Sequence, residues 1–321
     1  MGMIITAAET AVPASAAPAT APQSPARAPA SAVDLAGRAA RACLARAGVP
    51  ASSVGVLVNV GVYREHNTFE PAMAALVQKE IGINLDYIAD PEPAAGFSFD
   101  LMNGACGVLN AVQVGQALLE TGSTDRLLIT AADVHPAGDA DRDTGYPYAD
   151  LAGAFLLERS AEPGAGFGPV RHYTADRPTD VEGYLDTGTM GTRGRTTITV
   201  RREPGHRARL TELAARAVTE YAEEFGLDLD RTLVIGPSAR TAANTAGTGA
   251  RAGTWAGDGP GAGDGPGVRA GAGGEPHTAA PVLGYLRAMD GARRDDYDRF
   301  LFVSAGAGPS AACAAYRPEG W

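Results

Sequence analysis

The sequence predicts an α/β fold in which strands and helices pack in layers. Short apolar runs of the length of buried strands alternate with longer segments in which apolar residues recur at helical spacing. This alternation is typical of α/β folds. The chain has 321 residues, of which 45% are hydrophobic, so it can form one large domain or two fused domains around a substantial core.

Strands and helices alternate regularly through the N-terminal half. The helix predicted at 33–48 has an apolar face, and the helix at 105–121 is nearly uncharged, so we expect the second to be buried on all sides. A segment rich in Pro, Ala and Ser at 13–31 predicts a surface loop. The other predicted elements are strands at 3–6, 54–60, 97–101, 126–131 and 152–158 and a helix at 71–82 with Pro at its first turn.

The C-terminal half of the chain shows a similar alternation of predicted strands and helices. It contains a Gly, Ala, Pro and Asp-rich stretch around 245–274, which has few apolar residues to bury and is predicted to be a disordered insertion. We therefore divide the chain into halves at 1–165 and 166–321. The predicted elements of the second half are helices at 207–225 and 278–289 and strands at 232–235 and 300–304.

Charge and cysteine usage exclude several classes of protein. The formal net charge of −10 disfavours a nucleic-acid partner. The three cysteines, Cys43, Cys106 and Cys313, have no zinc-ligand spacing and form no disulfide framework, so we expect a reducing, cytoplasmic location and no metal. No apolar run approaches about 20 residues, which argues against a membrane-spanning helix. The N-terminus also lacks the pattern of a secretory signal.

Cys106 is the strongest candidate for a reactive residue. It lies between a predicted strand and the start of the apolar helix, where helix amides stabilise a thiolate and lower its pKa. Gly104, Ala105 and Gly107 around it leave room for an acyl chain. The alternative is a buried structural cysteine, a common role for this residue. The local pattern alone leaves both interpretations open.

Several motifs occur in order along the chain. They are VGVLVNV at 54–60, LVQ at 76–78, FDLMNGACG at 99–107, YADLAGAFLLE at 148–158 and FVSAGAGPS at 302–310. From about residue 34 to about residue 317, these motifs resemble the β-ketoacyl-acyl-carrier-protein synthase III family (ketosynthase III) of the thiolase superfamily. In the third motif, Cys106 occupies the position of the family's nucleophilic cysteine.

The resemblance implies a layered α-β-α-β-α thiolase fold built from two similar halves, usually as a homodimer. It also implies an acyl-cysteine intermediate on Cys106, loaded from acyl-CoA or a phosphopantetheinyl acyl carrier protein, with no permanently bound cofactor. By motif position, the backbone N–H groups of Cys106 and Gly306 would form the oxyanion hole, with Gly308 supporting this turn beside the substrate. Each such donor contributes roughly 3–4 kcal/mol to transition-state stabilisation.

The chain departs from the family where the family carries a His in PHQAN and an Asn in GNTSAA. These side chains stabilise the enolate formed when a malonyl thioester loses carbon dioxide. Ser238, in IGPSAR at 235–240, stands in place of the His, and His277, in GEPHTAA at 274–280, stands at or beside the Asn. A serine hydroxyl takes up no proton near neutral pH, so His277 remains as the best base. Ser238 would orient His277 or bind the acceptor, and Arg240 would meet a phosphopantetheine arm.

A Cys–His pair is sufficient for acyl transfer. The sequence therefore predicts an acyltransferase that moves an acyl group to an oxygen, nitrogen or sulfur of a small-molecule acceptor, as in polyketide or antibiotic pathways of secondary metabolism. Two alternatives remain open: a carbon–carbon condensing synthase III, and a non-catalytic partner subunit of such a synthase.

The remaining histidines and a basic cluster complete the candidates. His66 is predicted to lie in an exposed loop, His135 to be structural, and His172 and His206 to be exposed. Acyl carriers are acidic, so the densest basic cluster is a candidate carrier surface, although a solvated helix entry explains it equally well. This cluster consists of Arg201, Arg202, Arg207 and Arg209.

Overall fold

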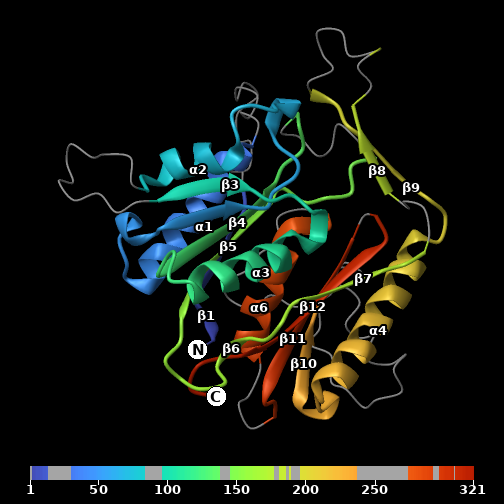
Figure 1. The fold of residues 1–321 in the computed structure, drawn as a ribbon. Helices are drawn as coiled ribbons and strands as arrows, with labels where there is room; N and C mark the ends of the chain where they lie inside the picture. Colours follow the sequence, from blue (N-terminus) through green and yellow to red (C-terminus); the bar gives the residue numbers. More distant parts are fainter. Residues whose placement is uncertain are drawn as a thin grey trace.

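Two mixed sheets organise the protein in the computed structural model (Figure 1). The structure describes residues 2–13, 30–83, 96–137, 145–176, 181–185, 188, 196–236, 274–291, 296–306 and 308–321. The first sheet has the strand order β1-β5-β4-β2-β3. Its strands are β1 (Met3–Ala11), β2 (Val56–Asn59), β3 (Phe97–Asp100), β4 (Arg126–Asp133) and β5 (Leu151–Arg159).

The second sheet is built from the C-terminal half and has the order β10-β11-β12-β6, with β7 also paired to β12. A separate hairpin joins β8 and β9. The strands are β6 (Gly166–Phe167), β7 (Arg171–Thr174), β8 (Val181–Tyr184), β9 (Thr199–Arg202), β10 (Thr232–Ile235), β11 (Arg299–Gly306) and β12 (Ser310–Arg317). Along the chain, the last strand of the first sheet ends at residue 159 and the first strand of the second sheet begins at residue 166. The division of the chain into two domains at residue 165 stays a prediction.

Helices form three layers around the two sheets (Figure 1). The helices α1 (Ala32–Ala47) and α2 (Met73–Ile81) cover the outer face of the first sheet. Between the sheets lie α3 (Gly107–Glu120) and α6 (Ala280–Gly291), and α4 (His206–Phe225) covers the outer face of the second sheet. The order is α-β-α-β-α, which confirms the predicted thiolase fold.

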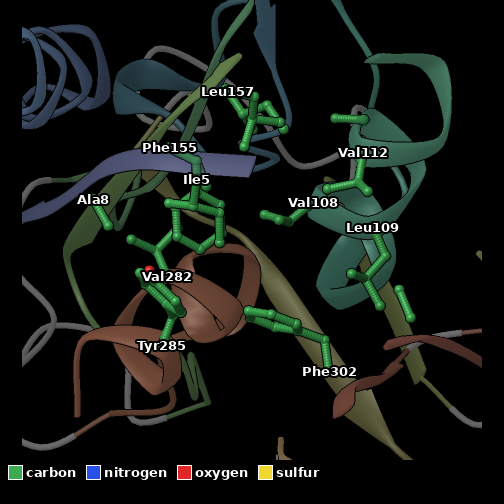
Figure 2. Packing of buried hydrophobic residues seen from close by; sticks show 14 of the residues in the cluster. Ile5, Ala8, Val108, Leu109, Val112, Phe155, Leu157, Val282, Tyr285 and Phe302 are labelled. Carbon is green, nitrogen blue, oxygen red and sulfur yellow. The ribbon is translucent and has the colours of Figure 1, made fainter. Parts of the chain in front are cut away.

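Alternating side chains of the first sheet explain this layering. In β2, Val56 and Val58 face the central layer, whereas Leu57 between them packs against α1 and α2. In the central core, Phe155 and Ile5 of the first sheet meet Val108 of α3 and Tyr285 of α6 (Figure 2). Full burial of each such side chain stabilises the fold by roughly 1.5–3 kcal/mol, so burial on both faces fixes the strand register.

Both ends of α1 are capped. The Ser31 hydroxyl accepts a hydrogen bond from the backbone N–H of Asp34, and Gly48 ends the helix in the left-handed conformation with φ 69°. The start of α2 differs from the prediction, because the helix begins at Met73 and not at Pro71. The carboxylate of Asp100 accepts the N–H groups of Met73 and Ala74 at 2.8 Å, so this residue of the family motif caps a helix.

The prediction that the helix at 105–121 is buried on all sides is wrong. The first turn is a 3₁₀ turn, η3 (Gly104–Cys106), and the α-helix begins at Gly107. Gln113, Ala117 and Glu120 are exposed, because the two sheets and α6 cover only part of α3 in this chain.

Several other predictions differ from the structure or lie outside it. Strand β1 extends to Ala11, five residues beyond the predicted end. The loop at 13–31 and the insertion around 245–274 fall almost wholly outside the described residues. No helix among the described residues is long and apolar enough to span a membrane.

Candidate active site

The carboxyl ends of three neighbouring strands converge on one edge of the first sheet. Strands β4, β2 and β3 run parallel to one another, and such an edge is where open α/β sheets bind ligands. Strand β3 leads into the turn that carries Cys106, β2 leads to the backbone around Tyr63, and β4 ends at Asp133. The second half of the chain adds His277, which opens the short turn η7 (His277–Ala279) before α6.

Cys106 ends η3 and is the N-cap residue of α3. Its side chain is only 1% exposed. Burial raises the pKa of the thiol to about 11, although the hydroxyl of Ser310 acts in the opposite direction. The prediction that helix amides lower this pKa is therefore wrong for the resting thiol, because desolvation of the charged form outweighs them. Cys106 needs a base to react at neutral pH.

Gly306 lies directly against the Cys106 turn. A Cβ atom at Gly306 would lie 3.1 Å from the Ala105 Cβ and 3.3 Å from the Ala105 backbone nitrogen, so a larger residue would push β11 away from η3. Gly308 follows with φ 74°, a conformation that favours glycine. The N–H of Cys106, the other predicted oxyanion donor, donates to the Asn103 carbonyl at 3.0 Å.

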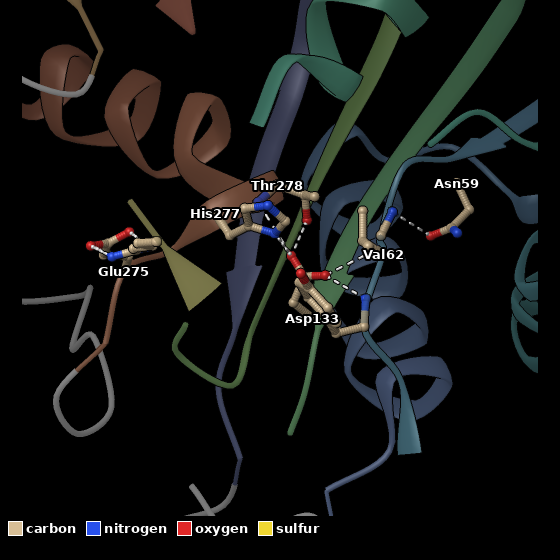
Figure 3. Close-up of polar contacts among 9 residues, drawn as sticks. Asn59, Val62, Asp133, Glu275, His277 and Thr278 are labelled. Carbon is tan, nitrogen blue, oxygen red and sulfur yellow. Dashed lines mark hydrogen bonds and ion pairs between the residues drawn. The ribbon is translucent and has the colours of Figure 1, made fainter. Parts of the chain in front are cut away.

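His277 is bonded to a carboxylate that the sequence analysis did not assign. The Nδ1 atom of His277 lies 2.9 Å from Oδ2 of Asp133, a residue that is 1% exposed (Figure 3). The same oxygen accepts the hydroxyl of Thr278 at 2.6 Å. The other oxygen, Oδ1, accepts the N–H groups of Val62 and Tyr63 at 2.9 and 2.8 Å.

The electrostatics of this pair fix how His277 is protonated. Burial raises the pKa of Asp133, but His277 and the hydrogen bonds of Thr278 and Tyr63 lower this pKa by more than burial raises it. The pKa of Asp133 is therefore below its ordinary value of 3.8. An ionised Asp133 accepts the proton on Nδ1 of His277 and leaves the lone pair on Nε2. His277 is thus oriented as a base by a carboxylate, the arrangement found in catalytic triads.

A stability measurement tests whether Asp133 is ionised. Because folding lowers its pKa, the carboxylate stabilises the fold above pH 3.8, and this contribution is lost as the pH falls through the folded-state pKa. We expect the difference in free energy of unfolding between the protein and an Asp133→Asn variant to shrink between about pH 7 and about pH 3 in urea titrations. A difference that grows as the pH falls over this range would argue for a protonated Asp133.

The imidazole of His277 is held between aromatic rings. Its centroid lies 4.1 Å from the ring of Tyr148 in a stacked arrangement and 5.6 Å from that of Tyr63. Its Nε2 atom faces the cysteine turn, because a Cβ atom built on Gly104 would lie 3.5 Å from it. Gly104 has φ 49° and carries no side chain to occupy this space. The free nitrogen of the base therefore lies beside the nucleophile's turn.

Glu275 anchors the segment that carries His277. Its carboxylate binds both terminal nitrogens of Arg202, at 2.9 and 2.6 Å, and lies 3.4 Å from Arg207. Its backbone pairs with Pro147 and Ala149. The guanidinium of Arg202 also lies 5.5 Å from the ring of Tyr148. Arg202 and Arg207 of the predicted carrier surface are therefore engaged with Glu275.

The other predicted residues are placed as follows. Ser238 and Arg240 lie outside the described residues. His66 and His172 are exposed and His135 is buried against Tyr146, as predicted. The prediction that His206 is exposed is wrong: it is buried at the start of α4. Its position directly before a predicted helix gave no sign of this burial.

Three residues of the site, Asp133, Tyr148 and Ser310, are not among those predicted from the sequence. A signal existed for Asp133, because this charged residue directly follows the uncharged run 127–132. Ser310 contacts the sulfur of Cys106 and stands in the terminal glycine motif, but nothing in the sequence singled it out.

Neither of two surface hollows found in the structure is lined by Cys106. One is lined by residues near the chain ends, including Gly166 and Arg317, and the other by Phe69, Pro71 and Asp100. Among the described residues, no group of three or more His, Cys, Asp or Glu side chains has the arrangement to hold a metal ion.

Comparisons with known proteins agree with the geometry. The sequence model of the family described as "3-Oxoacyl-[acyl-carrier-protein (ACP)] synthase III" matches residues 99–175. A β-ketoacyl-[acyl-carrier-protein] synthase III of Sodalis glossinidius is 34% identical over 128 residues, which cover 39% of this chain and 37% of the relative. The chain thus matches less than half the length of this relative and of other curated synthases III. Its resemblance to synthase III is confirmed for this region.

Solved structures match over almost the whole chain. A 3-oxoacyl-[acyl-carrier-protein] synthase III from Aquifex aeolicus superposes with a TM-score of 0.69 at 15% identity, covering 98% of this chain and 100% of that one. The priming β-ketosynthase from the R1128 polyketide biosynthetic pathway also gives 0.69, at 17% identity, covering 99% and 96%. At this low identity, the likeness shows a common fold.

Proposed function

We propose that this chain, which resembles synthase III over residues 99–175 and shares its fold, is an acyltransferase working through an acyl group on Cys106. The observation that carries the proposal is the hydrogen bond between Nδ1 of His277 and Oδ2 of Asp133 at 2.9 Å. It gives the neighbourhood of Cys106 a base that is oriented for proton transfer and whose free nitrogen faces the cysteine turn.

In the first half-reaction, Nε2 of His277 takes the proton of the Cys106 thiol. The thiolate attacks the carbonyl carbon of acyl-CoA or of an acyl carrier protein thioester, and the carbon–sulfur bond of the donor breaks. The departing thiolate takes the proton back from His277. The products are acyl-Cys106 and the free thiol of the donor, and no permanently bound cofactor takes part.

In the second half-reaction, His277 removes a proton from the oxygen, nitrogen or sulfur of a small-molecule acceptor. The acceptor attacks the thioester carbonyl, and Cys106 leaves as a thiolate that recovers the proton. Asp133 stays ionised and stabilises the imidazolium formed in each half-reaction. Ser238 and Arg240 remain candidates for contacts with the acceptor and the phosphopantetheine arm.

A decarboxylative condensing enzyme is the second candidate, because the curated relatives are described as synthases III. Incubation with a malonyl thioester labelled at the free carboxylate distinguishes the two. We expect a malonyl adduct on Cys106 by peptide mass spectrometry and no release of labelled carbon dioxide. Release at the rate of acceptor consumption would favour condensation. Absence of any adduct on Cys106 after treatment with an acyl thioester would favour a non-catalytic partner subunit.

We place this acyl transfer in secondary metabolism. The structural likeness to a priming ketosynthase from a polyketide pathway supports this, as does the replacement of both enolate-binding side chains of the family motif. A panel of small-molecule acceptors, offered to the acyl-loaded protein, tests it through loss of the Cys106 adduct.

We further propose that the chain forms a homodimer through the outer edge of β3. Among the described strands, β3 pairs only with β2, so its other edge is unpaired. Phe97 on this strand is 51% exposed and Met102 just after it is 61% exposed, which is unusual for large apolar side chains at a sheet edge. A second copy of the same edge would cover both.

A charge at this edge is expected to weaken the dimer. We predict that Phe97→Lys shifts the mass measured by light scattering from that of a dimer toward that of a monomer. Exposed Tyr184, on the separate β8–β9 hairpin, provides the matched control, and Tyr184→Lys is expected to leave the mass unchanged. A dimer that withstands Phe97→Lys at micromolar concentration would place the interface elsewhere.

A further inference from the structure

The sulfur of Cys106 lies against the paired strands β11 and β12. Its Sγ atom is 3.7 Å from the backbone oxygen of Ser304 on β11 and 3.8 Å from the backbone oxygen of Ser310 on β12. The hydroxyl oxygen of Ser310 lies 4.0 Å from the same sulfur. These contacts enclose the buried thiol on the side of the second sheet.

The contacts have different effects on the thiol and the thiolate. A carbonyl oxygen accepts a hydrogen bond and never donates one, so both backbone oxygens favour the protonated thiol. Loss of the proton leaves a negative sulfur facing two electronegative oxygens in a site with little water. The Ser310 hydroxyl can turn about its Cβ–Oγ bond, so it is the side-chain group in these contacts that can donate to a thiolate.

The other titratable groups around the Cys106 turn cannot take the place of the Ser310 hydroxyl as a hydrogen-bond donor to the resting sulfur. The turn η7 contributes His277, which acts as the base and becomes positive only after it has taken the proton. Strand β12 also contributes the buried thiol of Cys313, whose ionisation would oppose that of Cys106. The contact from β11 is the backbone oxygen of Ser304.

We propose that the hydroxyl of Ser310 donates a hydrogen bond to the Cys106 thiolate and thereby activates the nucleophile. This inference deepens the proposed acyl transfer and rests on it. The proton of the thiol moves to His277, the hydroxyl keeps its own proton, and no bond of Ser310 is broken. When the sulfur is acylated it loses its negative charge, so the same hydrogen bond weakens and does not hold back the second half-reaction.

Alkylation of Cys106 by iodoacetamide measures this effect without any acyl donor. The rate at Cys106, quantified by peptide mass spectrometry between about pH 7 and about pH 10, follows the thiolate fraction. We expect Ser310→Ala to react about tenfold more slowly at each pH below the thiol pKa, a change equivalent to ~1.4 kcal/mol, and its profile to move to higher pH. Ser160→Ala removes another buried, hydrogen-bonded serine, far from Cys106 in sequence, and is expected to leave the profile unchanged.

A second pair of variants separates the hydroxyl from packing. Ser310→Thr keeps a hydroxyl and Ser310→Val has the same shape without one, and both suit a strand position. The threonine variant is expected to react within about threefold of the unmodified protein and the valine variant about tenfold more slowly. Equal rates for these two variants, or an unmoved profile for Ser310→Ala, would overturn the proposal.

Acyl loading, measured separately, distinguishes this inference from the proposed function. If thioesters leave no adduct on Cys106 while Ser310→Ala still moves the alkylation profile, the acyltransferase assignment fails and the role of Ser310 stands. If Cys106 is acylated and the profile does not move, the role of Ser310 fails alone.

Discussion

Replacement of Cys106 by alanine is expected to abolish acyl loading and to lower turnover by at least about 10³-fold, because no other described thiol lies beside an oriented base. The variant loses one sulfur atom from a buried position, so its free energy of unfolding should change by only about 1 kcal/mol. Intact-mass spectrometry after treatment with an acyl thioester measures the loading, and urea unfolding measures the stability.

Cys43 and Cys313 provide the controls for this experiment. Both are fully buried, and Cys43 lies in α1 on the outer face of the first sheet. Cys43→Ala should load as the unmodified protein does. If Cys106→Ala still acquired the adduct, or still turned over, the nucleophile would have to be another residue.

The second large effect is expected from the His277–Asp133 pair. His277→Ala removes the base and should slow acyl transfer by at least about a hundredfold. Asp133→Asn should slow it by about 10²–10⁴-fold, because an amide that donates to Nδ1 moves the proton of the imidazole to Nε2 and blocks the base. Single-turnover decay of acyl-Cys106 in the presence of an acceptor measures both.

The controls come from neighbours that share the structural environment of the pair. Thr278→Val removes the hydroxyl that donates to Asp133 but leaves the carboxylate and imidazole in place, so we expect a loss well below that of Asp133→Asn. A double variant of His277 and Asp133 should be no slower than His277→Ala, since the carboxylate acts through the imidazole. Additive losses would mean that the two residues act independently.

Much of the fold could be predicted because burial leaves a strong imprint on sequence. The runs that become β2, β4 and β5 are apolar on both faces, as expected for strands covered by helices on each side. The Cys106 turn was predictable because small residues, a strand and a helix start occur together. Strand β12 was missed, because an alanine-rich run such as 310–317 carries neither β-branched residues nor alternation.

The site was only half predictable, because its electrostatics depend on which strands are neighbours. His277 stood out by its chemistry, but its partner Asp133 lies 144 residues earlier and reaches it only because the turn η7 packs against β4. The pKa of Cys106 was predicted in the wrong direction, because the sequence displays the helix amides but not the burial of the sulfur, which raises the pKa.

The most direct test of the proposed acyl transfer is a crystal structure of the protein with a slowly hydrolysed acyl group on Cys106. We expect a thioester to Sγ, Nδ1 of His277 still bonded to Asp133, and Nε2 within about 2.6–3.2 Å of an acceptor or water placed to attack the thioester carbon. An acyl group attached elsewhere, or an imidazole turned away from the thioester with another base in its place, would contradict it.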